Sequence, residues 1–70
     1  MNVNALKAQM ALAGMTAQAL CEKTGINQSS FYRKMAGKVE FTQGEISAIA
    51  RELKMNKDTI FAVFFAAEVS

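Results

Sequence analysis

The sequence contains no histidine, no proline and no tryptophan, and its single cysteine is Cys21. Without histidine it lacks the commonest general base and the commonest metal ligand. One thiol allows neither an internal disulfide nor a cysteine cluster for zinc. We therefore expect no catalytic residues, no metal site and no cofactor. A small, buried, unpaired Cys21 also fits the reducing environment of the cytoplasm.

Long apolar runs are missing as well. The longest, residues 60–67, has eight residues, well below the roughly 20 that a transmembrane helix needs. The start of the chain has no basic flank followed by an apolar block, as a secretory signal would. At 70 residues, 51% hydrophobic and 20% charged, residues 1–70 are predicted to form one globular domain. A domain this small buries only about 60% of the surface that its unfolded chain exposes. It can hardly enclose a pocket, so no small-molecule ligand is expected.

The lack of proline, together with only four glycines, favours helices. Apolar residues recur with helical spacing, and no segment alternates apolar and polar residues as a half-buried strand does. Helix start and stop signals divide the chain into five short helices, and these signals are Gly14, Thr16, Gly25, Asn27, Gly37, Thr42 and Asn56. Thr42 and Glu45 have the spacing of a capping box. We therefore predict an all-α fold.

Helices of this length do not persist alone in water, so a shared core must hold them together. The predicted core consists of Leu6, Met10, Leu20, Ile26, Phe31, Met35, Phe41, Ile46, Ile49, Leu53, Ile60 and Phe64.

Positive charge gathers in the middle of the chain. Residues 22–38 carry four basic side chains against Glu22 alone, whereas residues 39–70 have a net charge of −2. No aspartate or glutamate occurs from Asn27 to Lys38. An acid-free stretch of amides, hydroxyls and basic groups is typical of a surface that contacts phosphates and base edges.

Two of the predicted helices meet at a tight turn centred on Gly25. Cys21 is small enough for the helices to approach closely there, and Leu20, Ile26 and Phe31 are placed to fix their crossing from inside. A glycine at the turn with flanking apolar residues is the pattern of a helix-turn-helix.

Residues 5–65 resemble the Cro/repressor-type helix-turn-helix DNA-binding domains, which have the lambda-repressor-like fold. The run from Phe31 to Lys38, followed by Glu40-Phe41-Thr42 and Glu45-Ile46, is most similar to small phage regulators. This resemblance implies five helices, with the third, at about 27–36, acting as the recognition helix in the major groove.

The resemblance also implies roles for individual residues. Base reading falls to Gln28, Ser29, Tyr32 and Arg33. Phosphate contacts fall to Thr16, Ala17, Gln18, Asn27, Lys34 and Lys38. Glutamine bonds adenine and arginine bonds guanine in a bidentate way, with about 1–3 kcal/mol of discrimination for each good pair.

Two positions depart from the family pattern. Ala17 stands where many relatives have a phosphate-binding glutamine. Lys34 and Met35 stand where many have an apolar residue and then a glutamate. We expect Met35 to take the core position and to leave Lys34 exposed.

The apolar run near the C-terminus allows two interpretations. Phe61, Val63, Phe65 and Val69 could form a homodimer seam, or Phe61 and Phe65 could close a small core together with Phe64. A contiguous apolar patch usually marks an interface, which favours the dimer.

The sequence therefore predicts a sequence-specific regulator of transcription that binds double-stranded DNA. The most specific version is a cytoplasmic, Cro-like phage or prophage repressor that binds an operator as a dimer. The alternative is a protein-interaction module on the same fold that binds another regulator, as an antirepressor or an antitoxin does.

Overall fold

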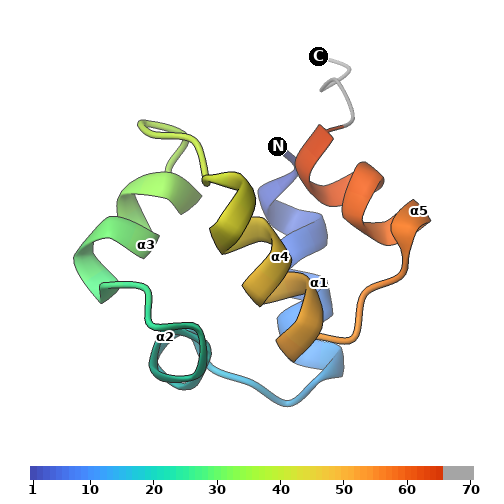
Figure 1. Ribbon diagram of the computed structural model, residues 1–70, viewed down its shortest axis with the longest axis horizontal. Coiled ribbons are helices and arrows are strands. Elements are labelled where there is room, and N and C mark those ends of the chain that lie inside the picture. The colour runs from blue at the N-terminus through green and yellow to red at the C-terminus, as the bar shows by residue number, and fades with distance from the viewer. Residues whose placement is uncertain (66–70) are drawn as a thin grey trace.

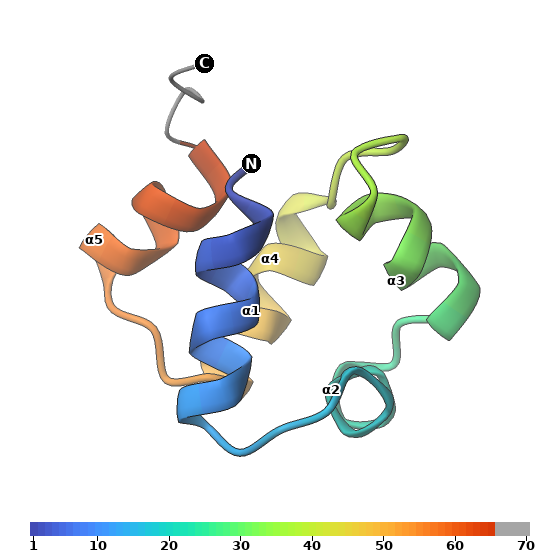
Figure 2. The same ribbon diagram turned by 180° about the vertical axis from the view of Figure 1, so that it is seen from behind.

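A computed structural model describes residues 1–65, all of whose regular structure is helical. The elements are α1 (Val3–Leu12), α2 (Ala17–Thr24), α3 (Gln28–Met35), α4 (Gln43–Glu52), α5 (Lys57–Ile60) and the π-helix η1 (Phe61–Phe65). α1 and α4 lie at the centre, with α2 and α3 on one side and α5 with η1 on the other (Figures 1 and 2). No helix in this part of the chain is long and apolar enough to cross a membrane.

Each α-helix begins at a polar cap, as the sequence predicts. Thr16, Asn27, Thr42 and Asn56 each accept a hydrogen bond from the backbone amide three residues further on, and Asn2 does the same for α1. These side chains satisfy amides that would otherwise lack a partner at the helix start. The predicted helix starts at Thr16, Asn27, Thr42 and Asn56 are confirmed, because local chemistry of this kind determines them.

The core draws on every helix except α5, which has no buried residue. It contains Leu6, Met10, Leu20, Cys21, Ile26, Phe31, Phe41, Ile49, Leu53 and Val63. Met35, Ile46, Ile60 and Phe64, which the sequence also assigned to the core, are half-buried. The last predicted helix is divided into α5 and η1, and the π register begins at Phe61.

Candidate nucleic-acid interface

The turn between α2 and α3 has the geometry of a helix-turn-helix. Gly25 adopts a left-handed conformation, with φ of 77°, and its N–H donates to the Cys21 carbonyl over 2.8 Å. Any residue with a Cβ would be strained there. Ile26 and Phe31 are buried on the inner side of the turn. The predicted motif is thus confirmed.

The outer face of α3 carries the four predicted base-reading residues. Successive residues of a helix are about 100° apart, so Arg33 points roughly away from the buried Phe31. Gln28, Ser29 and Arg33 are exposed. Tyr32 is 56% exposed, with its ring edge-on to that of Phe31. Among residues 1–65, none of the side-chain hydrogen bonds uses these four residues.

The starts of α2 and α3 supply further polar groups. The Thr16 hydroxyl accepts from the Ala19 amide over 3.1 Å, and the side-chain oxygen Oδ1 of Asn27 accepts from the Ser30 amide over 3.2 Å. The Thr16 hydroxyl and the Asn27 side-chain NH₂ group can each still donate a hydrogen bond. Gln18 donates from its side-chain amide to Glu22 on the same helix over 3.5 Å. Ala17 is half-buried, and its backbone N–H is the only polar donor that it can offer.

The C-terminal end of α3 holds Lys38 in an exposed loop. Gly37 is left-handed, with φ of 82°. The amide of Gly37 donates to the Lys34 carbonyl, and that of Lys38 donates to the Arg33 carbonyl, each over 3.1 Å. This pair of bonds is a Schellman motif. It places the exposed Lys38 directly beyond α3.

Lys34 is less exposed than the sequence predicts. Its side chain is only 12% exposed, and Nζ donates to both carboxylate oxygens of Glu45, over 2.6 and 2.7 Å. The expectation that Lys34 is exposed is therefore wrong, whereas its contact with phosphate stays a prediction. Partial burial raises the pKa of the Glu45 carboxyl, but bonds from Lys34 and Thr42 and the charge of Lys34 outweigh it, so the pKa lies below its usual value.

Cys21 lies under the helix-turn-helix, where it is buried and unpaired. Burial raises the pKa of its thiol, which keeps the nucleophilic thiolate scarce. In the described part of the chain no three residues among histidine, cysteine, aspartate and glutamate cluster as a metal site.

Comparison with known families agrees with this geometry. The profile of the Cro/C1-type HTH DNA-binding domain matches residues 5–64. The chain belongs to this family. No protein of curated function and no solved structure matches it.

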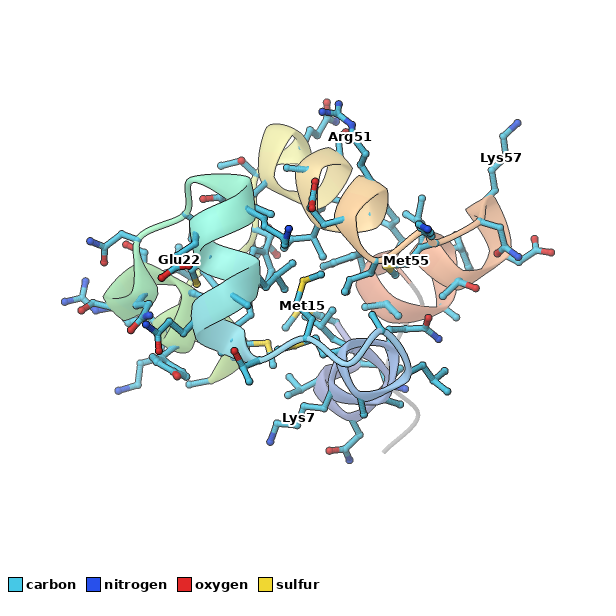
Figure 3. All side chains as sticks on the ribbon, turned by 90° about the horizontal axis from the view of Figure 1, so that it is seen from below. Lys7, Met15, Glu22, Arg51, Met55 and Lys57 are labelled. Atoms are coloured by element: carbon cyan, nitrogen blue, oxygen red, sulfur yellow. The ribbon has the colours of Figure 1, made fainter. Side chains whose placement is uncertain are left out.

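In this Cro/C1-type domain, Lys7 is a residue that the sequence analysis missed. It lies on α1 and lines an open depression of about 520 Å³ together with Ala17 of α2 and with Tyr32 and Ala36 of α3. Figure 3 shows the Lys7 side chain extending away from α1. Lys7 is outside the basic segment 22–38, so only the packing of α1 beside α2 and α3 reveals its place.

The apolar residues at the end of the domain separate into two groups. Val63 is 1% exposed and belongs to the core, so its predicted place on a dimer seam is wrong. Phe61 and Phe65 are 61% and 56% exposed, so they do not close the core. Phe64 is half-buried, and its ring packs edge-on against that of Phe41, with ring centres 5.8 Å apart. Val69, also predicted for the seam, is outside the described residues.

Proposed function

We propose that this DNA-binding domain is a sequence-specific transcriptional repressor of the Cro-like kind that phages and prophages encode. The observation that carries the proposal is the outer face of α3. It is free of carboxylates and presents Gln28, Ser29, Tyr32 and Arg33 to solvent. Amides, hydroxyls and a guanidinium without an opposing acid suit base edges between negatively charged phosphates.

The proposed complex places α3 in the major groove of a DNA duplex. Gln28 and Arg33 are then the candidates for bidentate bonds to adenine and guanine. The amides and caps at the starts of α2 and α3, at Thr16 and Asn27, would lie against the phosphates. Lys38 and Lys7 would contribute affinity without reading sequence.

We also propose that two copies act together. Phe61 and Phe65 are exposed on one short helix, and neighbouring exposed aromatic rings are typical of an interface. A two-fold dimer would place two α3 helices in successive major grooves, about 34 Å apart. Occupying such an operator within a promoter, in the cytoplasm, is the proposed route to repression, and it needs no enzymatic activity.

Selection from random duplexes at near-physiological salt tests the proposal. The full chain is expected to enrich an inverted repeat whose half-sites are about one helical turn apart. Arg51→Ala is a matched control, because this exposed arginine lies on α4 and outside the proposed interface (Figure 3). It should enrich the same repeat. If the wild-type chain enriches no sequence, the proposal is wrong.

The second candidate is a protein-interaction module similar to an antirepressor or an antitoxin. The exposed Phe61 and Phe65 favour it, since the same rings could meet a different protein. The discriminating test is co-purification with the products of neighbouring genes, combined with DNA binding at low salt. A stable heterodimer that has no affinity for any duplex would select this candidate over the repressor.

A further inference from the structure

Lys34 and Glu45 form an ion pair that joins α3 to the start of α4. The two side chains are 12% and 22% exposed, and the lysine donates to both carboxylate oxygens. Glu45 is itself fixed, because its Oε1 accepts from the Thr42 amide over 2.9 Å while its own amide donates to the Thr42 hydroxyl over 3.1 Å. The Lys34 ammonium also lies 5.8 Å from the centre of the Phe41 ring. Within residues 1–65, Glu45 is the one hydrogen-bonding partner of the Lys34 ammonium.

The other contacts of α3 constrain its rotation less. α3 packs beside α2, and Phe31 packs edge-on against Phe41 with ring centres 5.7 Å apart. Hydrophobic burial is not directional, and an edge-to-face aromatic pair accepts a range of ring positions, with centres about 4.5–7 Å apart. A charge-assisted pair with two hydrogen bonds is more narrowly directional. The Lys34–Glu45 pair thus supplies the directional contact between α3 and α4.

Small rotations of α3 matter because hydrogen bonds to base edges require the reading side chains to be accurately positioned. Arg33 and Lys34 are consecutive on the helix, so they move together when it turns. A rotation of about 20° moves a side chain at the helix surface, roughly 5–6 Å from the axis, by about 2 Å. Productive binding geometry tolerates only about 0.5 Å. Loss of the pair would therefore affect base reading before it affects general attraction to DNA.

We propose that the Lys34–Glu45 pair sets the rotation of α3 and thereby holds Tyr32 and Arg33 in the orientation that reads bases. This inference rests on the proposed DNA-binding function. Lys34 is a positioning residue that stays bonded to Glu45 in the complex, and it neutralises no phosphate.

The test compares the same substitution at two lysines of one helix end. Lys34→Met keeps an unbranched side chain that is one atom shorter and removes the charged ammonium, and Lys38→Met does the same at an exposed position in the following loop. For each full-length chain we would measure affinity for the selected duplex and for a scrambled duplex between about 50 and 200 mM salt. Equilibrium unfolding would establish that each variant is folded at the assay temperature.

The two variants should behave differently. Lys34→Met should lower the ratio of selected to scrambled affinity by about tenfold, with an unchanged dependence of log affinity on log salt. Lys38→Met should leave the ratio unchanged and make the salt slope shallower by about 0.9. Lys34→Arg should recover most of the ratio, because a guanidinium can bond both oxygens of Glu45.

Two results would overturn the proposal. One is an equal loss on both duplexes with a shallower slope in Lys34→Met, which would make Lys34 a phosphate contact. The other is a folded Lys34→Met chain with an unchanged ratio. If Lys34→Met does not fold, the test uses the wild-type chain. The NMR chemical shift of the Glu45 carboxyl carbon is measured with and without the selected duplex, and the proposal requires that it stays unchanged. A change of this chemical shift to the value of an unpaired carboxylate would show that the ion pair breaks in the complex, and would contradict the proposal. A wild-type chain that selects no duplex would instead remove the proposed function itself.

Discussion

The backbone amide of Asn2 lies 2.7 Å from the carbonyl oxygen of Val63 and donates a hydrogen bond to it. Asn2 caps α1, and Val63 lies in η1. The bond therefore joins the two ends of the described chain, which lie side by side in Figure 1. Val63 is held by its backbone on one side and by the core on the other, whereas its neighbour Phe61 faces solvent.

Val63→Ala should destabilise the fold, because the substitution removes two methyl groups from a fully buried site. We expect the free energy of unfolding to fall by about 2 kcal/mol. The measurement is chemical denaturation at one fixed, low protein concentration, since a dimer would make stability depend on concentration. A change below about 0.5 kcal/mol would contradict the assignment of Val63 to the core.

Phe61→Ala should affect self-association rather than the stability of the fold. Its ring is mostly exposed, so the unfolding free energy at low concentration should change little. Self-association should weaken if the ring lies in the proposed dimer. Sedimentation equilibrium measures this directly, with Val63→Ala as the comparison. An unchanged association constant would remove Phe61 from the interface.

Arg33→Ala should alter which sequence is preferred. Loss of a bidentate contact to guanine should reduce discrimination at one operator position by about 1–3 kcal/mol, while affinity for unrelated duplexes falls much less. The measurement is a set of affinities for duplexes that differ at single positions. Arg51→Ala removes an equal charge from α4 and should leave every preference in place. An unchanged preference in Arg33→Ala would show that another residue reads that base.

Local signals in the sequence were enough to predict the helices and the turn. Thr16 and Asn27 cap their helices through atoms three residues away, and Gly25 has a conformation that its own lack of a side chain permits. The outward face of α3 followed from helical geometry once Phe31 was assigned to the core.

Contacts between distant residues were not predictable in this way. Lys34 is drawn inward by Glu45, which is eleven residues further along the chain. Val63 is buried because α1 packs against η1. Lys7 lies beside the helix-turn-helix only because the fold brings α1 there. Helical periodicity places Lys34 on the side of Phe31 and Val63 on the side of Ile60, but it does not identify Glu45 or α1 as their partners. Nothing local in the sequence places Lys7.

Lys7→Ala should weaken binding to every duplex alike. If Lys7 neutralises one phosphate, its loss should make the slope of log affinity against log salt shallower by about 0.9. Lys57→Ala is the matched control, because Lys57 projects from α5 at the opposite side of the molecule (Figure 3). Its slope should equal that of the wild type. Equal slopes for both variants would place Lys7 outside the interface.

Lys54→Gly should stabilise the domain. Lys54 follows α4 in a left-handed conformation, with φ of 54°, and the Met55 amide donates to the Ala50 carbonyl in the Schellman arrangement. Glycine adopts this conformation without the steric penalty of a Cβ. We therefore expect a gain of up to about 1 kcal/mol in the free energy of unfolding. Lys54→Ala, which removes the charge but keeps the Cβ, should bring no such gain in the same denaturation experiment.

Acid should weaken the fold through Glu45. Its pKa is lower in the folded domain than in the unfolded chain, where it is near 4.5. The folded state therefore binds fewer protons. The resulting stability is fully present above the unfolded pKa and is lost as pH falls through the folded pKa. Glu45→Gln should thus be less stable than the wild type at pH 7, and the difference should shrink below about pH 4.5.

Denaturation midpoints measured between about pH 7 and pH 3 test this difference. Glu22→Gln is the control, because this carboxylate is exposed on α2 and, within residues 1–65, its hydrogen-bond partner is the neutral amide of Gln18. At pH 7 it should cost much less stability than Glu45→Gln, because it breaks no ion pair. A constant difference between the wild type and Glu45→Gln over the whole range would mean that the Glu45 carboxylate gains nothing from Lys34, and would count against the ion pair as a structural contact.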